Sequence, residues 1–94
     1  MMEMPSERWC AFFQGWPADM PRRGILVTTF DEQIPFSGFL TREDFLVLER
    51  QTPDSLGART IVLAYDVVAG LKITEVVRAK TFQGVGFQGA FSKR

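Results

Sequence analysis

The stretch from residue 24 to residue 77 constrains the fold most, because it divides into five short runs with the composition of β-strands. β-Branched and aromatic side chains recur in each run. The runs are 25–30, 33–41, 45–50, 59–65 and 67–77. Gly38 and Gly70 lie inside two of them, and a glycine within a strand marks a sharp bend or a close backbone approach. Five short, bent strands predict a small β-barrel rather than a flat sheet.

The run 33–41 carries the clearest strand pattern. Apolar or small residues recur in it at every second position, and we expect these to share one buried face. They are Ile34, Phe36, Gly38 and Leu40. Pro35 cannot donate a hydrogen bond to a neighbouring strand, which predicts an edge or a bulge at this end of the strand.

Residues 6–16 are predicted to form a helix in front of the barrel. Ser6 can cap its first turn, and Pro17 cannot continue it. Four large aromatic side chains fall at helical spacing on one face: Trp9, Phe12, Phe13 and Trp16. A face of this kind must be buried. We expect it to pack on the barrel, with a peptide-binding or membrane-surface face as the alternative.

Residues 78–94 are predicted to form a loose glycine- and phenylalanine-rich tail. Phe82-Gln83-Gly84 is repeated as Phe87-Gln88-Gly89, and Phe91 follows. Such low complexity is typical of a segment that is disordered in an isolated subunit, and its phenylalanines would order it against a neighbour. The spacing of glycines at 84, 86 and 89 matches a dinucleotide-binding motif, but no helix can follow it, so we expect no cofactor. At 94 residues the chain has room for one domain only, so we predict that residues 1–94 form a single domain.

The composition argues against an enzyme. The chain contains no His and no Asn, and Cys10 is its one cysteine. Without His there is no Ser-His or Cys-His nucleophile and no common metal ligand. The paired carboxylates Asp31-Glu32 and Glu43-Asp44 fall in predicted turns, where they are solvated. We therefore predict no catalytic residue, no metal and no cofactor.

Charge is balanced over the whole chain but unevenly placed along it. The formal net charge is zero, with nine acids and five bases in residues 1–56 and two acids and six bases in residues 57–94. This asymmetry has two interpretations. In the first, opposite ends of the fold, or of neighbouring subunits, attract each other. In the second, one basic face of the protein binds phosphate.

The start of the chain has no basic region followed by an apolar stretch, and no run approaches the length of a membrane span. These features predict a cytoplasmic protein with no membrane partner.

Two segments resemble the motifs of the Sm-like family, which comprises the Sm and Lsm proteins and the bacterial RNA chaperone Hfq. The first is Ile34-Pro35-Phe36-Ser37-Gly38-Phe39-Leu40, followed by Glu43-Asp44-Phe45 and Leu46-Val47-Leu48. The second is Ile61-Val62-Leu63-Ala64-Tyr65-Asp66-Val67-Val68-Ala69-Gly70-Leu71. The resemblance covers residues 8–77. It implies an N-terminal helix followed by a strongly bent five-stranded barrel, and subunits that assemble into a homo-oligomeric ring.

The residues with which that family holds RNA have no counterpart in this chain. Val47 lies near the position of the family's base-binding Asn, and Ala64-Tyr65-Asp66 falls where the family carries Arg-Gly or Lys-His. We therefore expect a structural or interaction subunit whose ring contact joins strand 59–65 to a neighbour's strand 67–75. The expected interface side chains are Ile61, Leu63, Val68 and Leu71. A protein partner would bind through the helix or the tail.

The alternative is an RNA-binding Sm-like protein whose recognition is mainly electrostatic. Its candidate RNA-binding residues are Arg22, Arg23, Arg50, Arg59 and Tyr65. Arg50 and Arg59 flank a predicted loop at 51–57, so they have a second interpretation, in which they form an ion-pair brace with Asp54 inside that loop.

Overall fold

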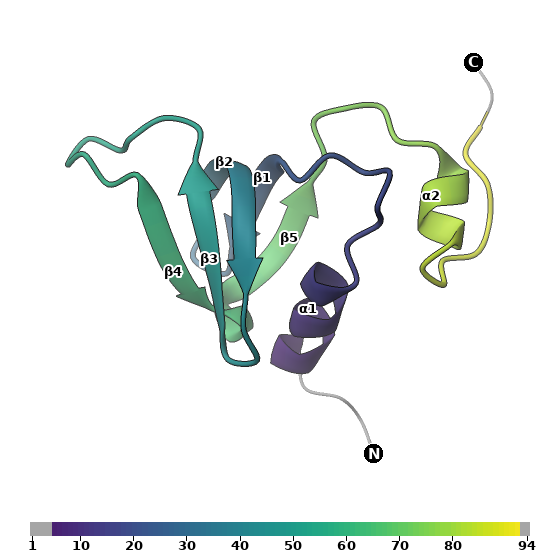
Figure 1. The fold of residues 1–94 in the computed structure, drawn as a ribbon, viewed down its shortest axis with the longest axis horizontal. Coiled ribbons are helices and arrows are strands. Elements are labelled where there is room, and N and C mark those ends of the chain that lie inside the picture. The colour runs from purple at the N-terminus through teal and green to yellow at the C-terminus, as the bar shows by residue number, and fades with distance from the viewer. Residues whose placement is uncertain (1–4, 93–94) are drawn as a thin grey trace.

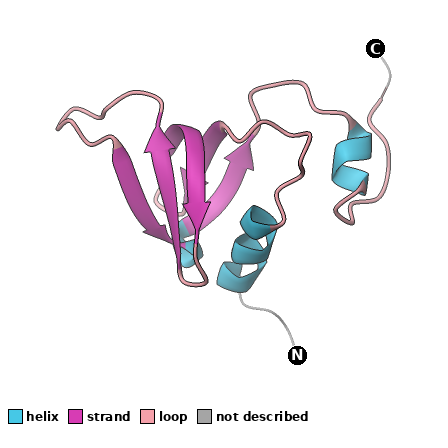
Figure 2. Cartoon of the chain, viewed as in Figure 1, coloured by secondary structure: helices cyan, strands magenta, loops and turns pink. Residues whose placement is uncertain are grey.

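A computed structural model describes residues 5–92 and contains one helix, five strands and a short second helix (Figures 1 and 2). The elements are α1 (Pro5–Gln14), β1 (Gly24–Thr28), β2 (Gln33–Thr41), β3 (Phe45–Arg50), β4 (Thr60–Ala64), the 3₁₀ turn η1 (Tyr65–Val67), β5 (Val68–Lys72) and α2 (Ala79–Gln83). The predicted bounds of β2 and β3 are confirmed, and α1 ends two residues earlier than predicted.

The five strands form one antiparallel sheet in the order β4-β3-β2-β1-β5. A mainly β fold with an N-terminal helix is therefore confirmed. Within the described residues no hydrogen-bonded pairing joins β4 to β5, so the sheet is open and these two strands are its edges. The closed Sm-like barrel remains a prediction.

A bend in β2 gives the sheet its shape. The first half of β2 pairs with β1 and the second half pairs with β3, so β2 belongs to two half-sheets that face each other across a V (Figure 1). The pairing with β3 shifts register between Phe36 and Gly38, as it does at a β-bulge. The bend predicted at Gly38 is confirmed.

The same bulge corrects the predicted face of β2. Ile34 and Phe36 are buried as expected, but Phe39 is 5% exposed and Leu40 is 69% exposed. An extra residue in a strand reverses the alternation of its side chains after that point. The prediction that Leu40 shares the buried face was therefore wrong, and Leu40 lies on the outer surface of the sheet.

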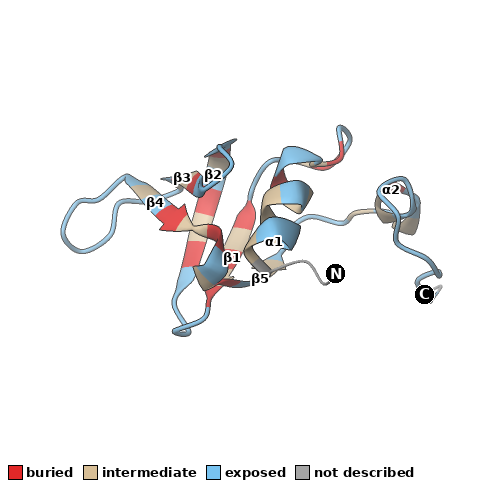
Figure 3. Ribbon diagram, turned by 90° about the horizontal axis from the view of Figure 1, so that it is seen from below, coloured by how far each residue is buried: buried red, intermediate tan, exposed pale blue. Residues whose placement is uncertain are grey.

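The hydrophobic core lies between the inner face of the sheet and α1 (Figure 3). Phe13 is the helix residue that enters it, with 1% of its surface exposed and its ring 5.1 Å from that of Phe39. Trp9 and Trp16 are partly buried against the same cluster. Phe12 instead contacts the C-terminal region, where its ring centroid lies 6.4 Å from that of Phe87. The predicted aromatic face of the helix is thus divided between the core and the C-terminal region.

Strand β5 ends at Lys72 rather than at residue 77. Its partner β1 begins at Gly24, and Lys72 already pairs with Ile25. Beyond that point no strand is available to accept its backbone hydrogen bonds. Residues 73–77 therefore leave the sheet.

Gly24 is a point of close backbone approach between β1 and β5. A Cβ atom at this position would collide with the carbonyl oxygen of Lys72. We expect Gly24→Ala to force the strands apart and to lower the free energy of unfolding by about 1–3 kcal/mol. Gly70→Ala is the matched control, because a Cβ there would meet Val27 Cβ at an ordinary 3.8 Å. Urea denaturation of both variants makes the comparison, and equal losses would contradict this account.

Candidate interaction surfaces

The two edge strands carry backbone groups that no described residue pairs. The backbone N–H of Arg50 donates to the carbonyl of Arg59 at 2.8 Å, which fixes the alternation along β4. In this register Ile61 and Leu63 direct their N–H and C=O groups toward β3. The N–H and C=O groups of Val62 therefore face outward, away from the sheet.

The predicted interface side chains do not lie on that free edge. Leu63 and Val68 are 8% and 4% exposed and belong to the core of their own subunit. Ile61 and Leu71 are partly buried against the same core. Contact with another chain at these edges would therefore run through the main chain and through outward side chains such as Val62, which is 59% exposed.

Three of the four candidate arginines are held within the chain. Arg22 donates to the Phe39 carbonyl at 3.0 Å, and its guanidinium carbon lies 3.7 Å from the centre of the Phe39 ring. Arg23 forms an exposed two-point ion pair with Glu75, at 3.0 and 3.3 Å. Arg50 donates to the Thr52 carbonyl at 3.2 Å.

Arg59 is the exception among the four. Its side chain is exposed, and its guanidinium forms no hydrogen bond or ion pair with another described residue. The backbone register places residue 59 beside Arg50, which pairs with Phe36 at the bend of β2. Arg50 and Arg59 therefore meet at that bend.

Tyr65 lies at the opposite end of β4 from Arg59. It is 2% exposed, and its hydroxyl is buried without a hydrogen bond among the described residues. Burial, with a further contribution from the neighbouring Cys10, raises the pKa of Tyr65 to about 12. Stacking of an RNA base on this ring would require it to leave the core. The structure thus separates Tyr65 from the arginines with which it was grouped.

The surface around Tyr65 is acidic. A groove of about 370 Å³ opens there between the start of α1, the β2–β3 turn and η1. Its lining includes four carboxylates: Glu7, Glu43, Asp44 and Asp66. Arg42 pairs with Asp44 at 2.6 Å, whereas the other three acids have no ion pair with a described residue. This end of the sheet would repel phosphate.

The loop between β3 and β4 is closed by Asp54 but not by an ion pair. The carboxylate accepts hydrogen bonds from the backbone N–H groups of Leu56 and Ala58, both at 2.9 Å. No ion pair joins Asp54 to Arg50 or Arg59 within residues 5–92. The proposed Arg–Asp brace is therefore replaced by a turn that Asp54 forms with its own backbone.

A pH dependence follows for this loop. The N–H groups of Ala58 and Leu56 favour the ionised carboxylate and hold the pKa of Asp54 below its ordinary value of about 3.9. A lowered pKa means that the loop contacts are fully present above the ordinary value and are lost as the pH falls through the folded-state pKa. We expect the carboxyl signal of Asp54 in an NMR titration to have its midpoint below about 3.9. A midpoint at or above that value would contradict these hydrogen bonds.

An apolar surface lies on the outer face of the sheet, and we call it the outer patch. It consists of Leu40, Phe45, Val47, Val62 and Ala64. Leu40, Val47 and Val62 are direct cross-strand partners in a single row over β2, β3 and β4. A groove of about 480 Å³ lies over Leu40 and Val47 of this row and is also lined by Arg22, Glu49 and Thr60.

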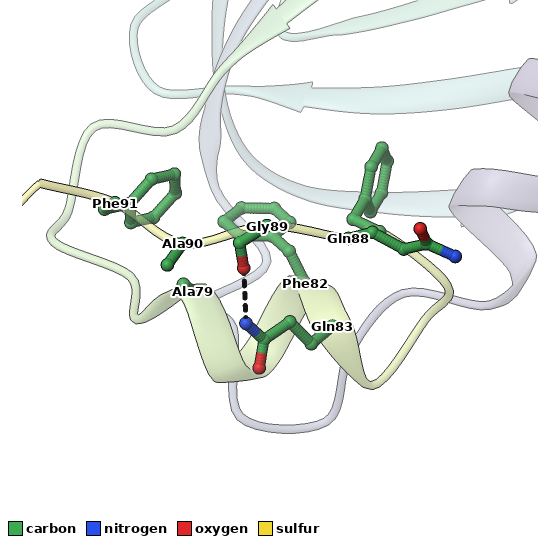
Figure 4. Close-up of a pocket in the computed structure, with 8 residues that line it drawn as sticks. Ala79, Phe82, Gln83, Gln88, Gly89, Ala90 and Phe91 are labelled. Carbon is green, nitrogen blue, oxygen red and sulfur yellow. Dashed lines mark hydrogen bonds between the residues drawn. The ribbon is translucent and has the colours of Figure 1, made fainter.

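Residues 73–92, which we call the C-terminal arm, include regular structure. They contain α2, and Thr81 of this helix donates to Asp19 at 2.7 Å. The arm then folds back on itself, with Gln83 Nε2 donating to the Gly89 carbonyl at 2.6 Å (Figure 4). The ring of Phe82 contacts those of Phe87 and Phe91 at 6.0 and 6.4 Å.

The arm is only loosely attached to the rest of the subunit. Within residues 5–92, the polar and ring contacts that join the arm to the other elements are the hydrogen bond to Asp19, the Arg23–Glu75 ion pair and the contact of Phe87 with Phe12. An apolar groove of about 490 Å³ remains open between α1, β5 and the arm. The arm thus retains an incompletely packed apolar side.

Sequence reasoning missed the outer patch because the bulge in β2 reverses its pattern. The alternation of Phe45, Val47 and Glu49 on β3 is visible in the sequence and could have indicated an outward apolar side chain at Val47. The helix within the arm has no comparable signal, because glycines follow it closely.

Two further findings concern metal sites and membrane spans. Within residues 5–92 no three His, Cys, Asp or Glu side chains gather as a metal site requires. No helix in that range is long and apolar enough to cross a membrane. In comparisons with known proteins, the chain matches no protein-family model, no curated protein and no solved structure.

Proposed function

We propose that this protein is a non-catalytic, Sm-like subunit that closes into a homo-oligomeric ring and serves as an interaction module. The observation that carries the proposal is the strand order β4-β3-β2-β1-β5, which leaves one unpaired edge on each half of a bent sheet. Exposed edges of this kind template pairing with another chain unless they are covered. If β5 of a neighbouring subunit paired with β4, the contact would cover the β4 edge of one subunit and the β5 edge of the next.

This contact is of the head-to-tail kind. It joins two different surfaces, so that each subunit contributes β4 to one neighbour and β5 to the other. Such contacts repeat by rotation and close into rings when the angle permits.

RNA binding is the second candidate, and the exposed guanidinium of Arg59 beside Arg50 is the observation that favours it. Several features weigh against it. Tyr65 is buried, the groove beside it is acidic, and Arg22 and Arg23 are engaged within the chain. Any affinity for RNA would be mainly electrostatic, so it should fall steeply as the salt concentration rises.

Chromatography of the purified protein with simultaneous light scattering and ultraviolet absorbance distinguishes the two candidates. The proposal predicts an oligomer whose absorbance is that of protein alone. An oligomer that elutes with nucleic acid, and that loses it in high salt, would favour the RNA-binding alternative. A monomer free of nucleic acid would contradict both.

A further inference from the structure

The C-terminal arm exposes more apolar surface than a short segment needs for its own structure. Val85, Phe87 and Phe91 are 40%, 54% and 64% exposed. Phe91 has one ring contact within the described residues, with Phe82 of the same arm. Exposed aromatic side chains gathered on one segment are typical of a surface that binds another protein surface.

The outer patch is a second apolar surface without a partner. Leu40 and Val62 are 69% and 59% exposed, and Phe45 is 39% exposed. Neither α1 nor the arm covers it, because α1 packs on the inner side of the V and the arm lies beyond α1 (Figures 1 and 3).

The two apolar surfaces lie at opposite ends of the subunit. In both views α2 is at one end of the longest axis and β4 is at the other (Figures 1 and 3). That axis extends over 42 Å. The arm of one subunit, as it is placed here, therefore cannot cover the outer patch of the same subunit, but the arm of a second copy can.

Charge also favours a second copy as the occupant. The arm carries two bases, Arg78 and Lys80, and one acid, Glu75, and two further bases follow it in the sequence. Glu49 lines the groove over Leu40 and Val47, and three further acids, Glu43, Asp44 and Asp66, line the separate groove that reaches Ala64 at the end of the patch. The two bases near the patch, Arg22 and Arg42, are engaged with the Phe39 carbonyl and with Asp44. A basic, aromatic segment thus faces an apolar surface with an acidic border.

The proposed ring contact would bring the two surfaces together, and this inference rests on that contact. If a neighbour's β5 pairs with β4 in the antiparallel sense found throughout this sheet, residue 73 of the neighbour emerges near Thr60. Thr60 lines the groove that lies over Leu40 and Val47 of the outer patch. The linker 73–77 can span roughly 16 Å. The distance from β4 across to β2 is about 10 Å, so the arm can reach the patch.

We propose that the C-terminal arm of one subunit docks on the outer patch of the next subunit in the ring. Phe87 and Phe91 would pack on the row formed by Leu40, Val47 and Val62. Residues 73–77 would act as the hinge. Docking would break the exposed, weak Arg23–Glu75 ion pair and would release Thr81 from Asp19 and Phe87 from Phe12.

Photo-crosslinking from position 91 of the full chain tests this inference. A benzophenone analogue of phenylalanine replaces Phe91, and copies labelled with ¹⁵N are mixed with unlabelled copies before illumination. Mass spectrometry of the cross-linked peptides then separates contacts between chains from contacts within one chain. We expect peptides of mixed label that join position 91 to β2, β3 or β4 on the outer patch.

Two substitutions provide the matched comparison. Leu40→Glu places a charge in the outer patch, and we expect it to lower the yield of mixed cross-links about tenfold. Leu56→Glu places the same charge at a loop residue that is 93% exposed, and we expect no change in that yield.

Light scattering on the same samples separates two kinds of failure. An oligomer whose cross-links from position 91 stay within one chain, or reach surfaces other than the outer patch, would overturn the docking of the arm and leave the ring intact. Equal yields for Leu40→Glu and Leu56→Glu would also overturn it. A monomeric protein would overturn the ring and the docked arm together.

Discussion

Phe13→Ala is expected to lower the free energy of unfolding by about 3–5 kcal/mol, the range for removing a large side chain from a well-packed core. Phe13 is 1% exposed, and its ring is stacked on that of Trp16 at 5.6 Å and meets Phe39 edge-on at 5.1 Å. Loss of the ring would leave a cavity between α1 and both halves of the sheet. Urea or thermal denaturation followed by circular dichroism measures the effect.

Phe30→Ala is the matched control for this substitution. Phe30 is 60% exposed in the β1–β2 turn, so we expect its loss to change the free energy of unfolding by less than about 0.5 kcal/mol. A loss below about 1 kcal/mol for Phe13→Ala would contradict the placement of α1 in the core.

Val62→Pro is expected to dissociate the oligomer while leaving the subunit folded. The N–H of Val62 faces the free edge of β4, so proline removes a donor that the proposed neighbour would use and removes none that pairs β4 with β3. Light scattering should give the mass of one chain, and the far-ultraviolet circular dichroism should stay close to that of the parent.

Two variants of β4 control this experiment. Val62→Thr keeps the N–H and a β-branched side chain, so we expect it to remain oligomeric. Ile61→Pro removes a donor to β3, and we expect unfolded or insoluble protein. A Val62→Pro protein that is folded and still fully oligomeric would show that the free edge of β4 is not the contact.

The elements that could be predicted from the sequence are those with a regular periodic pattern of apolar residues. Strand β3 and the core residue Phe13 follow simple periodic patterns with turns or proline at their ends, and both were predicted correctly. Beyond Phe36 in β2 the pattern fails, because a bulge adds one residue that periodicity does not anticipate.

The candidate site was harder to predict from the sequence, because its residues come from different helices, strands and loops. Tyr65 ends a strand, where the sequence allows either packing or base stacking, and in the fold the helix residue Phe13 lies beside it in the core, at 6.5 Å between the two rings. Arg22 precedes β1 by two residues, and only the fold brings it onto Phe39. Such contacts depend on the packing of distant segments, which composition and spacing do not specify.

The mass of the wild-type protein in solution tests the central claim most directly. Multi-angle light scattering at tens of micromolar, in low and high salt, would measure it. The account predicts a mass of at least three times 10.7 kDa, in both low and high salt, because the contact runs through the main chain. A stable mass of 10.7 kDa at that concentration would contradict the ring.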